Sequence, residues 1–442
     1  MLDWKKLLSS ERLKTGIDLA AGGAAVAEAR PSAAASARTP FEADYGRVIF
    51  SAATRRLAGK TQVHPFSSVD YVHNRLTHSL EVSTVAYSLV RELDRFFVSE
   101  VGLDAGQTEA VAWIVRTAAL AHDLGNPPYG HAGEFAIRQW AGGEGAASIL
   151  PPDAAADFRL YDGNAQTFRL LSRSDLRDSS YFRLTLAALG AGVKYPFRIG
   201  SPEAEGAGKC AAFSSEAVAF DCAMSALGLK RGGGYVRHPL SYLVEAADDI
   251  CYLLADMEDA IALHVLREGD VKRLVLRLFP DGMAAEMKLS EKSPVQFLRA
   301  MAIERLVHAF AAAFREKYGE IMDGVPVGPL DRNVDESTRA AMDDWRAQYK
   351  VVFKTPHKVV SEIGAYQEFS ALFDKYAGLL GKVGTPYSGL DFLSRRLIDL
   401  AWSEEFYERH LAYPKSWWAH VVLDFVVGMT DSYMHNLVGA LA

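Results

Sequence analysis

The stretch from Thr117 to Trp140, TAALAHDLGNPPYGHAGEFAIRQW, gathers ionisable side chains at the end of an apolar helical run. His122 and Asp123 close that run, and His131 and Glu134 follow within a dozen positions. Imidazoles and carboxylates are the side chains that bind transition metals and transfer protons. This spacing therefore indicates a metal site with acid–base groups beside it.

Helix-breaking residues fix where the run ends. Gly125 stands where a helix C-cap is wanted, and Pro127 and Pro128 prevent continuation. The sequence therefore predicts that His122 and Asp123 lie in the last helical turn. Both can reach one ion beyond the helix end, where the helix dipole also favours a cation.

Two other predicted helices offer further metal ligands. His78 lies on an otherwise apolar stripe in NRLTHSLEV. The segment YLVEAADDICYLLADMEDA crowds acids onto an apolar helix, and such crowding needs a compensating charge. Asp248, Tyr252 and Asp256 recur at steps of four and share one face, whereas Asp249 is turned away by about 100°. Asp248 is therefore the predicted inward ligand.

The resulting ligand set is His78, His122, Asp123 and Asp248. Two imidazoles with two carboxylates suit manganese, iron, zinc or, less readily, magnesium, and the sequence does not choose among them. Each part also has a plain structural interpretation. A histidine on an apolar helix face is more often a core residue, and an acidic helix is often a solvated face. The three segments together favour the metal site.

Composition limits the other possibilities. The chain has 442 residues, a formal net charge of −7 and three cysteines without a CxxC pair. These values do not indicate a global nucleic-acid-binding surface, a disulfide framework or a thiolate zinc site. No apolar run reaches the roughly 18 residues of a membrane span, and the N-terminus does not resemble a signal peptide. We expect a soluble, cytoplasmic protein without membrane contact.

Helical spacing of apolar residues predicts a mainly α-helical globule without internal repeats. Short strands are expected only around residues 60–66 and 191–197. The chain divides into a flexible lead-in (1–40), a helical core (41–322) and a C-terminal helical lobe packed on that core (323–442). Residues 199–218 and 323–341 are rich in Gly, Pro or small polar residues and are expected to be surface insertions.

The order His78, His122-Asp123, Asp248 resembles the H…HD…D pattern of the HD superfamily of metal-dependent phosphohydrolases. Further stretches resemble one branch, the dGTPase-like deoxynucleoside triphosphate triphosphohydrolases. They occur in the family's order over most of the chain: IFSAATRRLAGKTQV, NRLTHSLEV, AHDLGNPPYGHAGE, DGNAQTFRLL, VKYP, EAADDICYLLADMEDA and FVVGMTDSY.

This resemblance implies an HD-domain helical fold and hydrolysis of a deoxynucleoside triphosphate at its α-phosphorus. The products would be deoxynucleoside and tripolyphosphate. It also implies a divalent metal ion, a homo-oligomer such as a hexamer, and possible regulation by an activator nucleotide or single-stranded DNA. Base preference is not readable from the sequence.

His131 is the candidate for proton transfer, because its ordinary pKa lies near neutral pH and its loop returns it to the helix end. Glu134, one turn further on, can orient His131 or share its proton. The pair matches the catalytic histidine and acid of the resembled family. Whether His131 acts as general acid or general base stays open.

Substrate contacts are expected from cations and polar groups near this centre. Arg75 precedes His78 by one helical turn, and Lys194 with Tyr195 matches a phosphate contact of the family. Arg56 and Lys60 lie in a segment that approaches the nucleoside in the family. The remaining candidates are Tyr252 for a phosphate, Asp256 for the sugar 3′-hydroxyl, and Asn164.

Two alternatives remain at this stage. The chain could be another HD phosphohydrolase, such as a nucleotidase or a cyclic-dinucleotide phosphodiesterase. It could also be a sensor that binds nucleotide or single-stranded DNA without turnover. The complete ligand set argues against the sensor.

Overall fold

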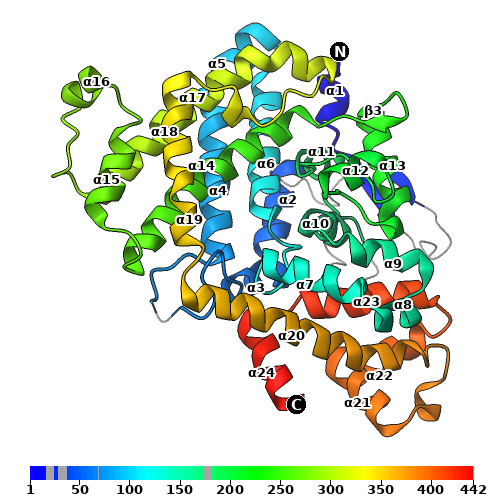
Figure 1. Ribbon diagram of the computed structural model, residues 1–442. Coiled ribbons are helices and arrows are strands. Elements are labelled where there is room, and N and C mark those ends of the chain that lie inside the picture. The colour runs from blue at the N-terminus through cyan, green and yellow to red at the C-terminus, as the bar shows by residue number, and fades with distance from the viewer. Residues whose placement is uncertain (16–23, 28–36, 68, 174–181, 442) are drawn as a thin grey trace.

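A computed structural model describes residues 1–15, 24–27, 37–67, 69–173 and 182–441. These residues are mainly α-helical, as the apolar periodicity predicts, and the helices build an elongated molecule with the N-terminus at one end and the C-terminus at the other (Figure 1). In chain order, the helices of the first half are α1 (Trp4–Leu7), α2 (Pro40–Ile49), α3 (Ala52–Arg56), α4 (Arg75–Glu92), α5 (Asp94–Phe96), α6 (Ala105–Ala121), α7 (His131–Ala141), α8 (Glu144–Ile149), α9 (Pro152–Arg159), α10 (Gly163–Ser172), α11 (Leu186–Ala191), α12 (Pro202–Ala207) and α13 (Ala217–Ala226).

The second half continues in the same way. Its helices are α14 (Pro239–Ala262), α15 (Glu268–Leu276), α16 (Asp281–Glu286), α17 (Val295–Asp323), α18 (Glu336–Ala347), α19 (Tyr349–Val352), α20 (Pro356–Leu380), α21 (Phe392–Ala401), α22 (Glu404–Arg409), α23 (Lys415–Val427) and α24 (Asp431–Leu441). Short helices named η join them at η2 (Leu57–Gly59), η3 (Phe97–Val101), η4 (Ser214–Glu216), η5 (Leu330–Arg332) and η6 (Tyr387–Gly389).

Strands are short and lie away from the expected places. β1 (Arg12–Thr15) pairs antiparallel with β2 (Ala24–Ala27), and β3 (Lys230–Arg231) pairs antiparallel with β4 (Gly234–Tyr235). The strands expected at 60–66 and 191–197 do not form. Only an isolated bridge joins Thr61 to Asn74. Tertiary packing, not local β propensity, decides both segments.

Local capping signals set the ends of the helices that carry the site. Asn74 and Thr77 form a reciprocal capping box at the start of α4, and Asp104 and Gln107 do the same for α6. Pro239 occupies the first turn of α14, where a missing backbone N–H costs nothing.

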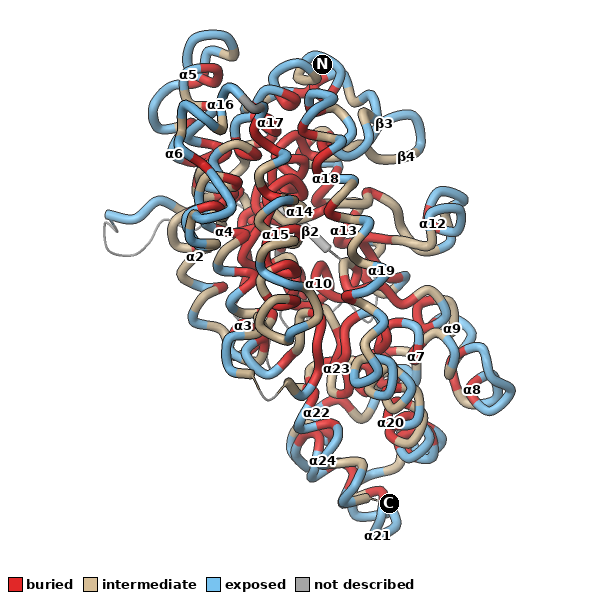
Figure 2. Tube along the Cα trace, turned by 60° about the vertical axis from the view of Figure 1, so that its left-hand side comes forward, coloured by how far each residue is buried: buried red, intermediate tan, exposed pale blue. Residues whose placement is uncertain are grey.

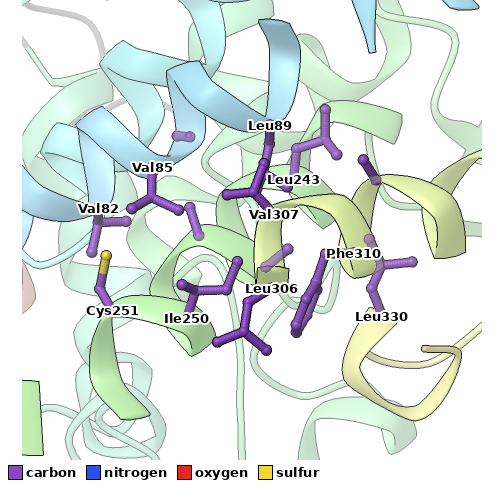
Figure 3. Close-up of a cluster of buried hydrophobic side chains, with 14 of the residues drawn as sticks. Val82, Val85, Leu89, Leu243, Ile250, Cys251, Leu306, Val307, Phe310 and Leu330 are labelled. Carbon is purple, nitrogen blue, oxygen red and sulfur yellow. The ribbon is translucent and has the colours of Figure 1, made fainter. Parts of the chain in front are cut away.

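The first hydrophobic core holds α4, α14 and α17 side by side. Val82, Val85 and Leu89 of α4 face Leu243 and Ile250 of α14, and Leu306, Val307 and Phe310 of α17 complete the layer (Figure 3). All these side chains are buried, and buried positions concentrate around α14 (Figure 2). This packing fixes α4 and α14, the helices of His78 and Asp248, relative to each other.

A second core joins α7 and α9 to the C-terminal helices α20 and α23. Residues 330–352, including Trp345, pack in the first core, whereas residues 365–434 pack in the second. The chain therefore changes core at α20, which runs across the molecule below the first core (Figure 1).

The expected lead-in of residues 1–40 falls partly outside the described residues. Within its first fifteen residues, Leu2, Leu7 and Leu13 are buried in a third cluster. Trp4 of α1 also contacts the folded part of the protein, because its indole N–H donates to the Tyr318 hydroxyl at 2.7 Å.

The two expected surface insertions are mostly exposed or half-buried, with a few buried residues. In residues 199–218, Cys210 and Phe213 are fully buried, and Arg198 forms a parallel bridge with Ala212. In residues 323–341, Leu330 and Ala341 are buried in the first core. Most of both stretches therefore lies at the surface as expected, and the buried residues anchor them to the cores.

A buried arginine joins α10 and Glu216 to α23. Arg169 of α10 is fully buried, and its guanidinium contacts Glu216 at 2.6 Å and Asp424 of α23 at 2.7 Å. Removing one partner of such a cluster leaves uncompensated buried charge.

We predict that Arg169→Met lowers the free energy of unfolding by about 3 to 5 kcal/mol, because Glu216 and Asp424 lose their shared counter-charge. Urea unfolding followed by circular dichroism measures the loss. Arg409→Met is the control, since its pair with Glu405 is exposed and should change stability by less than about 0.5 kcal/mol. Equal stability of the two variants would contradict the role of Arg169.

Candidate metal centre and active site

Helix α6 ends at Ala121, so His122 is its C-cap and Asp123 follows directly, slightly beyond the predicted last turn. The Nδ1 of His122 lies 2.7 Å from the backbone oxygen of Ala119. Because that carbonyl can only accept, Nδ1 carries a proton, and Nε2 is the ring nitrogen that would face a metal ion.

Gly125 serves a purpose other than the expected C-cap. It has no positive φ, but a Cβ on it would lie 2.2 Å from the Thr167 nitrogen and 2.3 Å from the Gly163 oxygen. The loop after His122 thus rests directly on the start of α10, which only glycine permits.

The four predicted ligands come together from three helices. His78 Nε2 lies 3.0 Å from Asp248 Oδ1, and His122 Nε2 lies 3.6 Å from the same oxygen and 3.4 Å from Asp123 Oδ1. His78, His122 and Asp123 offer donor atoms that all lie within 4.8 Å of one another.

The donors of His78, His122 and Asp123 are close enough to share one ion, and Asp248, 3.6 Å from His122, lies beside this group. Two donors that each lie about 2.1 Å from a metal are about 3.0 to 3.4 Å apart at octahedral or tetrahedral angles. The mixed nitrogen and oxygen set suits manganese, iron or zinc and does not select one of them.

Charge supports the same arrangement. Burial alone would lower the pKa of His122, but the Asp123 and Asp248 carboxylates raise it to about 9. Burial would raise the pKa of Asp248, but the His122 and His78 imidazoles hold it well below its usual range. The pocket therefore keeps its carboxylates ionised and needs positive charge between them.

Arg75 contributes part of that charge. Its Nη1 donates to Asp123 Oδ2 at 2.7 Å, and it lines the cavity beside the ligands. A Cβ on Gly130 would lie 2.7 Å from its Nη2, so the loop backbone also holds the guanidinium. Arg75 thus orients a metal ligand, a contact that sequence reasoning did not anticipate.

His131 and Glu134 form the expected pair on α7. His131 Nδ1 lies 3.0 Å from Glu134 Oε2, and the other carboxylate oxygen accepts the Gly163 N–H at 2.8 Å. Glu134 is buried, whereas the His131 side chain is 77% exposed toward the cavity. A buried carboxylate thus holds an exposed imidazole, the usual arrangement for proton transfer.

One cavity of about 730 Å³ connects the metal centre with this pair. The predicted site residues that line it are His78, Arg75, His122, Asp123, His131, Glu134, Asn164, Lys194, Tyr195, Asp248 and Tyr252. Burial would lower the pKa of Lys194, but Glu245 and Asp248 raise it above its usual value, so Lys194 stays cationic.

Arg56 and Lys60 do not line this cavity. Both line a separate, smaller cavity of about 90 Å³ with Trp402 and Phe406. The Lys60 Nζ is buried and donates to the backbone oxygens of Asn126 at 2.5 Å and Val427 at 2.7 Å. Lys60 therefore ties the metal loop to α23.

Asp256 does not line the cavity either. It is 1% exposed, and neither carboxylate oxygen has a hydrogen-bond partner. Burial, and then the Asp259 charge, raise its pKa well above the usual value. Its predicted contact with a sugar hydroxyl has no opening in the described structure.

The polar cavity residues that sequence reasoning missed include Gln62, Lys209, Lys354 and Lys358. The Gln62 Oε1 is buried without a hydrogen-bond partner. Lys354 and Lys358 flank Pro356 at the start of α20, and their spacing of four beside a helix-starting proline was the available signal. No sequence pattern pointed to Lys209 as a cavity residue, because its neighbours in the sequence are mostly small residues.

Comparison with known proteins agrees with this geometry. The HD domain family model matches residues 75–149, which contain His78, His122 and Asp123. A deoxyguanosinetriphosphate triphosphohydrolase-like protein of Pseudomonas aeruginosa is 35% identical over 98% of this chain and 97% of its own length. The chain belongs to the deoxyguanosinetriphosphate triphosphohydrolase-like family.

Other members of this deoxyguanosinetriphosphate triphosphohydrolase-like family are less similar. One from Synechocystis is 32% identical over 97% of both chains. A deoxyguanosinetriphosphate triphosphohydrolase of Yersinia enterocolitica is 29% identical over 90% of this chain and 92% of its own. The HD domain and these relatives make this family member a metal-dependent phosphohydrolase. Among its described residues, none of the helices is long and apolar enough to span a bilayer.

We predict that His122→Ala and Asp248→Ala each abolish tight binding of a divalent metal, because each removes one of four donors. Metal content after dialysis, measured by plasma mass spectrometry, gives the result. His308→Ala, which removes a half-exposed histidine paired with Glu92, is the matched control. Normal metal content in Asp248→Ala would show that Asp248 is not a ligand.

Proposed function

We propose that this protein hydrolyses a deoxynucleoside triphosphate at the α-phosphorus and releases deoxynucleoside and tripolyphosphate. The observation that carries the proposal is one cavity that joins the metal centre, the His131–Glu134 pair and a row of lysines. The names of the relatives support the substrate class.

The substrate brings several negative charges, and the cavity offers matching cations. Lys194, Lys354 and Lys358 line it, and Tyr195 lies beside Lys194. Arg75 adds a guanidinium whose Nη1 is already given to Asp123. We assign the triphosphate to this side, because lysine ammonium groups bind phosphate oxygens as point charges.

The bound divalent ion would be held by His78, His122, Asp123 and Asp248, and it supplies charge neutralisation at phosphate and activation of water. His131 faces the cavity from the first turn of α7 and transfers the proton at the reacting oxygen. Glu134 accepts from His131 Nδ1, so the other ring nitrogen, Nε2, is directed toward substrate.

Polar groups on the remaining walls are assigned to the nucleoside. Burial, and then the Asp256 charge, raise the pKa of Tyr252, so its hydroxyl stays protonated and can donate. The orphaned Gln62 Oε1 lacks a donor, which a sugar hydroxyl would supply. Asn164 lies at the cavity wall beside Asp162. The homo-oligomer, activator nucleotide and single-stranded DNA stay predictions.

We predict that incubation of the full chain with dGTP and Mn²⁺ yields deoxyguanosine and tripolyphosphate in equal amounts. Phosphorus NMR and chromatography of the nucleoside identify both products. A panel of deoxy- and ribonucleoside triphosphates, alone and in pairs, tests substrate range and activation. Release of pyrophosphate or monophosphate without tripolyphosphate would favour another HD phosphohydrolase, and binding without turnover would favour a sensor.

We predict that His131→Ala lowers kcat by about 10²- to 10⁴-fold while metal content stays normal, because the variant loses proton transfer and keeps every metal ligand. Initial rates and metal analysis on the same preparation give both values. His435→Ala is the control, since this histidine pairs with Glu368 on α20 and lies outside the cavity lining. Unchanged kcat would remove His131 from the reaction.

A further inference from the structure

We propose that Lys209 is a positioning residue that holds the His131–Glu134 pair in its working geometry. The proposal rests on the proposed function and adds a residue to it. Lys209 Nζ lies 3.7 Å from Glu134 Oε2 and 3.9 Å from Asp162 Oδ2, so one ammonium faces two carboxylates.

Both carboxylates are almost completely out of water. The side chain of Glu134 is 5% exposed and that of Asp162 is 0% exposed. Two ionised carboxylates in one dry space repel each other, and each is costly to bury without a counter-charge. Among the described residues, Lys209 is the lysine within ion-pair distance of both.

The hydrogen bonds accepted by Glu134 and Asp162 show which contacts the Lys209 ammonium supports. Glu134 divides its oxygens between His131 Nδ1 and the Gly163 N–H. Asp162 accepts from the Asn164 N–H at 2.8 Å and from the Cys210 N–H at 3.1 Å. Each bond needs an ionised acceptor to stay strong, so loss of the ammonium would weaken the hold on His131.

The backbone on both sides of Lys209 is held in place by neighbouring residues. Helix α12 ends at Gly208, whose φ of 62° turns the chain back, and the Arg138 guanidinium of α7 donates to the Gly208 oxygen at 3.4 Å. Directly after Lys209, Cys210 is fully buried. The lysine is thus anchored on both sides and carries its ammonium to the cavity wall beside His131.

Proton equilibria give the expected direction of a pH effect. Burial would raise the pKa of Glu134, but His131 and Lys209 lower it to about 2. Burial and Glu134 raise the pKa of Asp162. The charged or titratable groups facing this pair are His131, Lys209, Tyr161, Arg138 and Cys210. Without the ammonium, both carboxyl groups take up protons at higher pH.

The test compares Lys209→Met and Lys209→Arg in the full chain with Mn²⁺ and dGTP. We expect Lys209→Met to lower kcat by about tenfold or more with little change in KM, and to move the acid limb of the kcat profile to higher pH. Lys209→Arg keeps the charge and should recover most of kcat and the original limb. Lys230→Met is the matched control, because it removes an exposed lysine paired with Asp221.

A second measurement does not depend on turnover. The ionised Glu134 carboxylate stabilises the fold above its unfolded pKa, near 4.5, and this contribution is lost as pH falls toward about 2, whereas the raised pKa of Asp162 acts in the opposite direction. In Lys209→Met the loss of melting temperature with falling pH should therefore begin at higher pH than in the wild type. This shift should appear even if dGTP is not the substrate.

Three outcomes would overturn the proposal. A raised KM with unchanged kcat would make Lys209 a substrate contact only. Equal losses in Lys209→Met and Lys209→Arg, with an unmoved acid limb, would show that its charge is not used. Identical melting profiles of Lys209→Met and Lys230→Met between pH 3 and 7 would show that the carboxyl pair does not feel the ammonium.

Discussion

The site depends on the attraction between two imidazoles and two carboxylates that the fold holds close together at the cavity. His78 is fully buried, and its Nε2 meets the Asp248 carboxylate at 3.0 Å. Neither group would be stable there alone, since an isolated buried charge is far more costly than a paired one. A divalent cation would be held by His78, His122 and Asp123, whose donor atoms lie within 4.8 Å of one another, with Asp248 beside them.

Apolar packing, which has no part in the chemistry, brings these donors into reach. The valines and leucines of α4 fit against Leu243 and Ile250 of α14 one or two turns from His78 and Asp248 (Figure 3). Because the core is closely packed, the positions of its helices relative to one another are tightly fixed. The precision of the metal centre is therefore a property of the core beside it.

Long periodic helices, and the side chains that they direct into the cavity, could be predicted from the sequence. Helical spacing alone selects Asp248 over Asp249, and Asp248 is the one that lines the cavity. Residues whose partners are distant backbone atoms could not be predicted. Lys60 is predicted as a substrate contact, but its acceptors are backbone carbonyls 66 and 367 positions away. Gly125 reads as a helix cap, but its neighbour is the backbone of α10.

Lys60 also connects the loop that carries Asn126 to α23, near the end of the chain. Its ammonium bridges Asn126, next to the metal ligands, and Val427, the last residue of α23, while Asp431 receives the Thr61 and Tyr129 N–H groups. A chain truncated before these residues would lack one of the two acceptors of the Lys60 ammonium and both N–H bonds to Asp431.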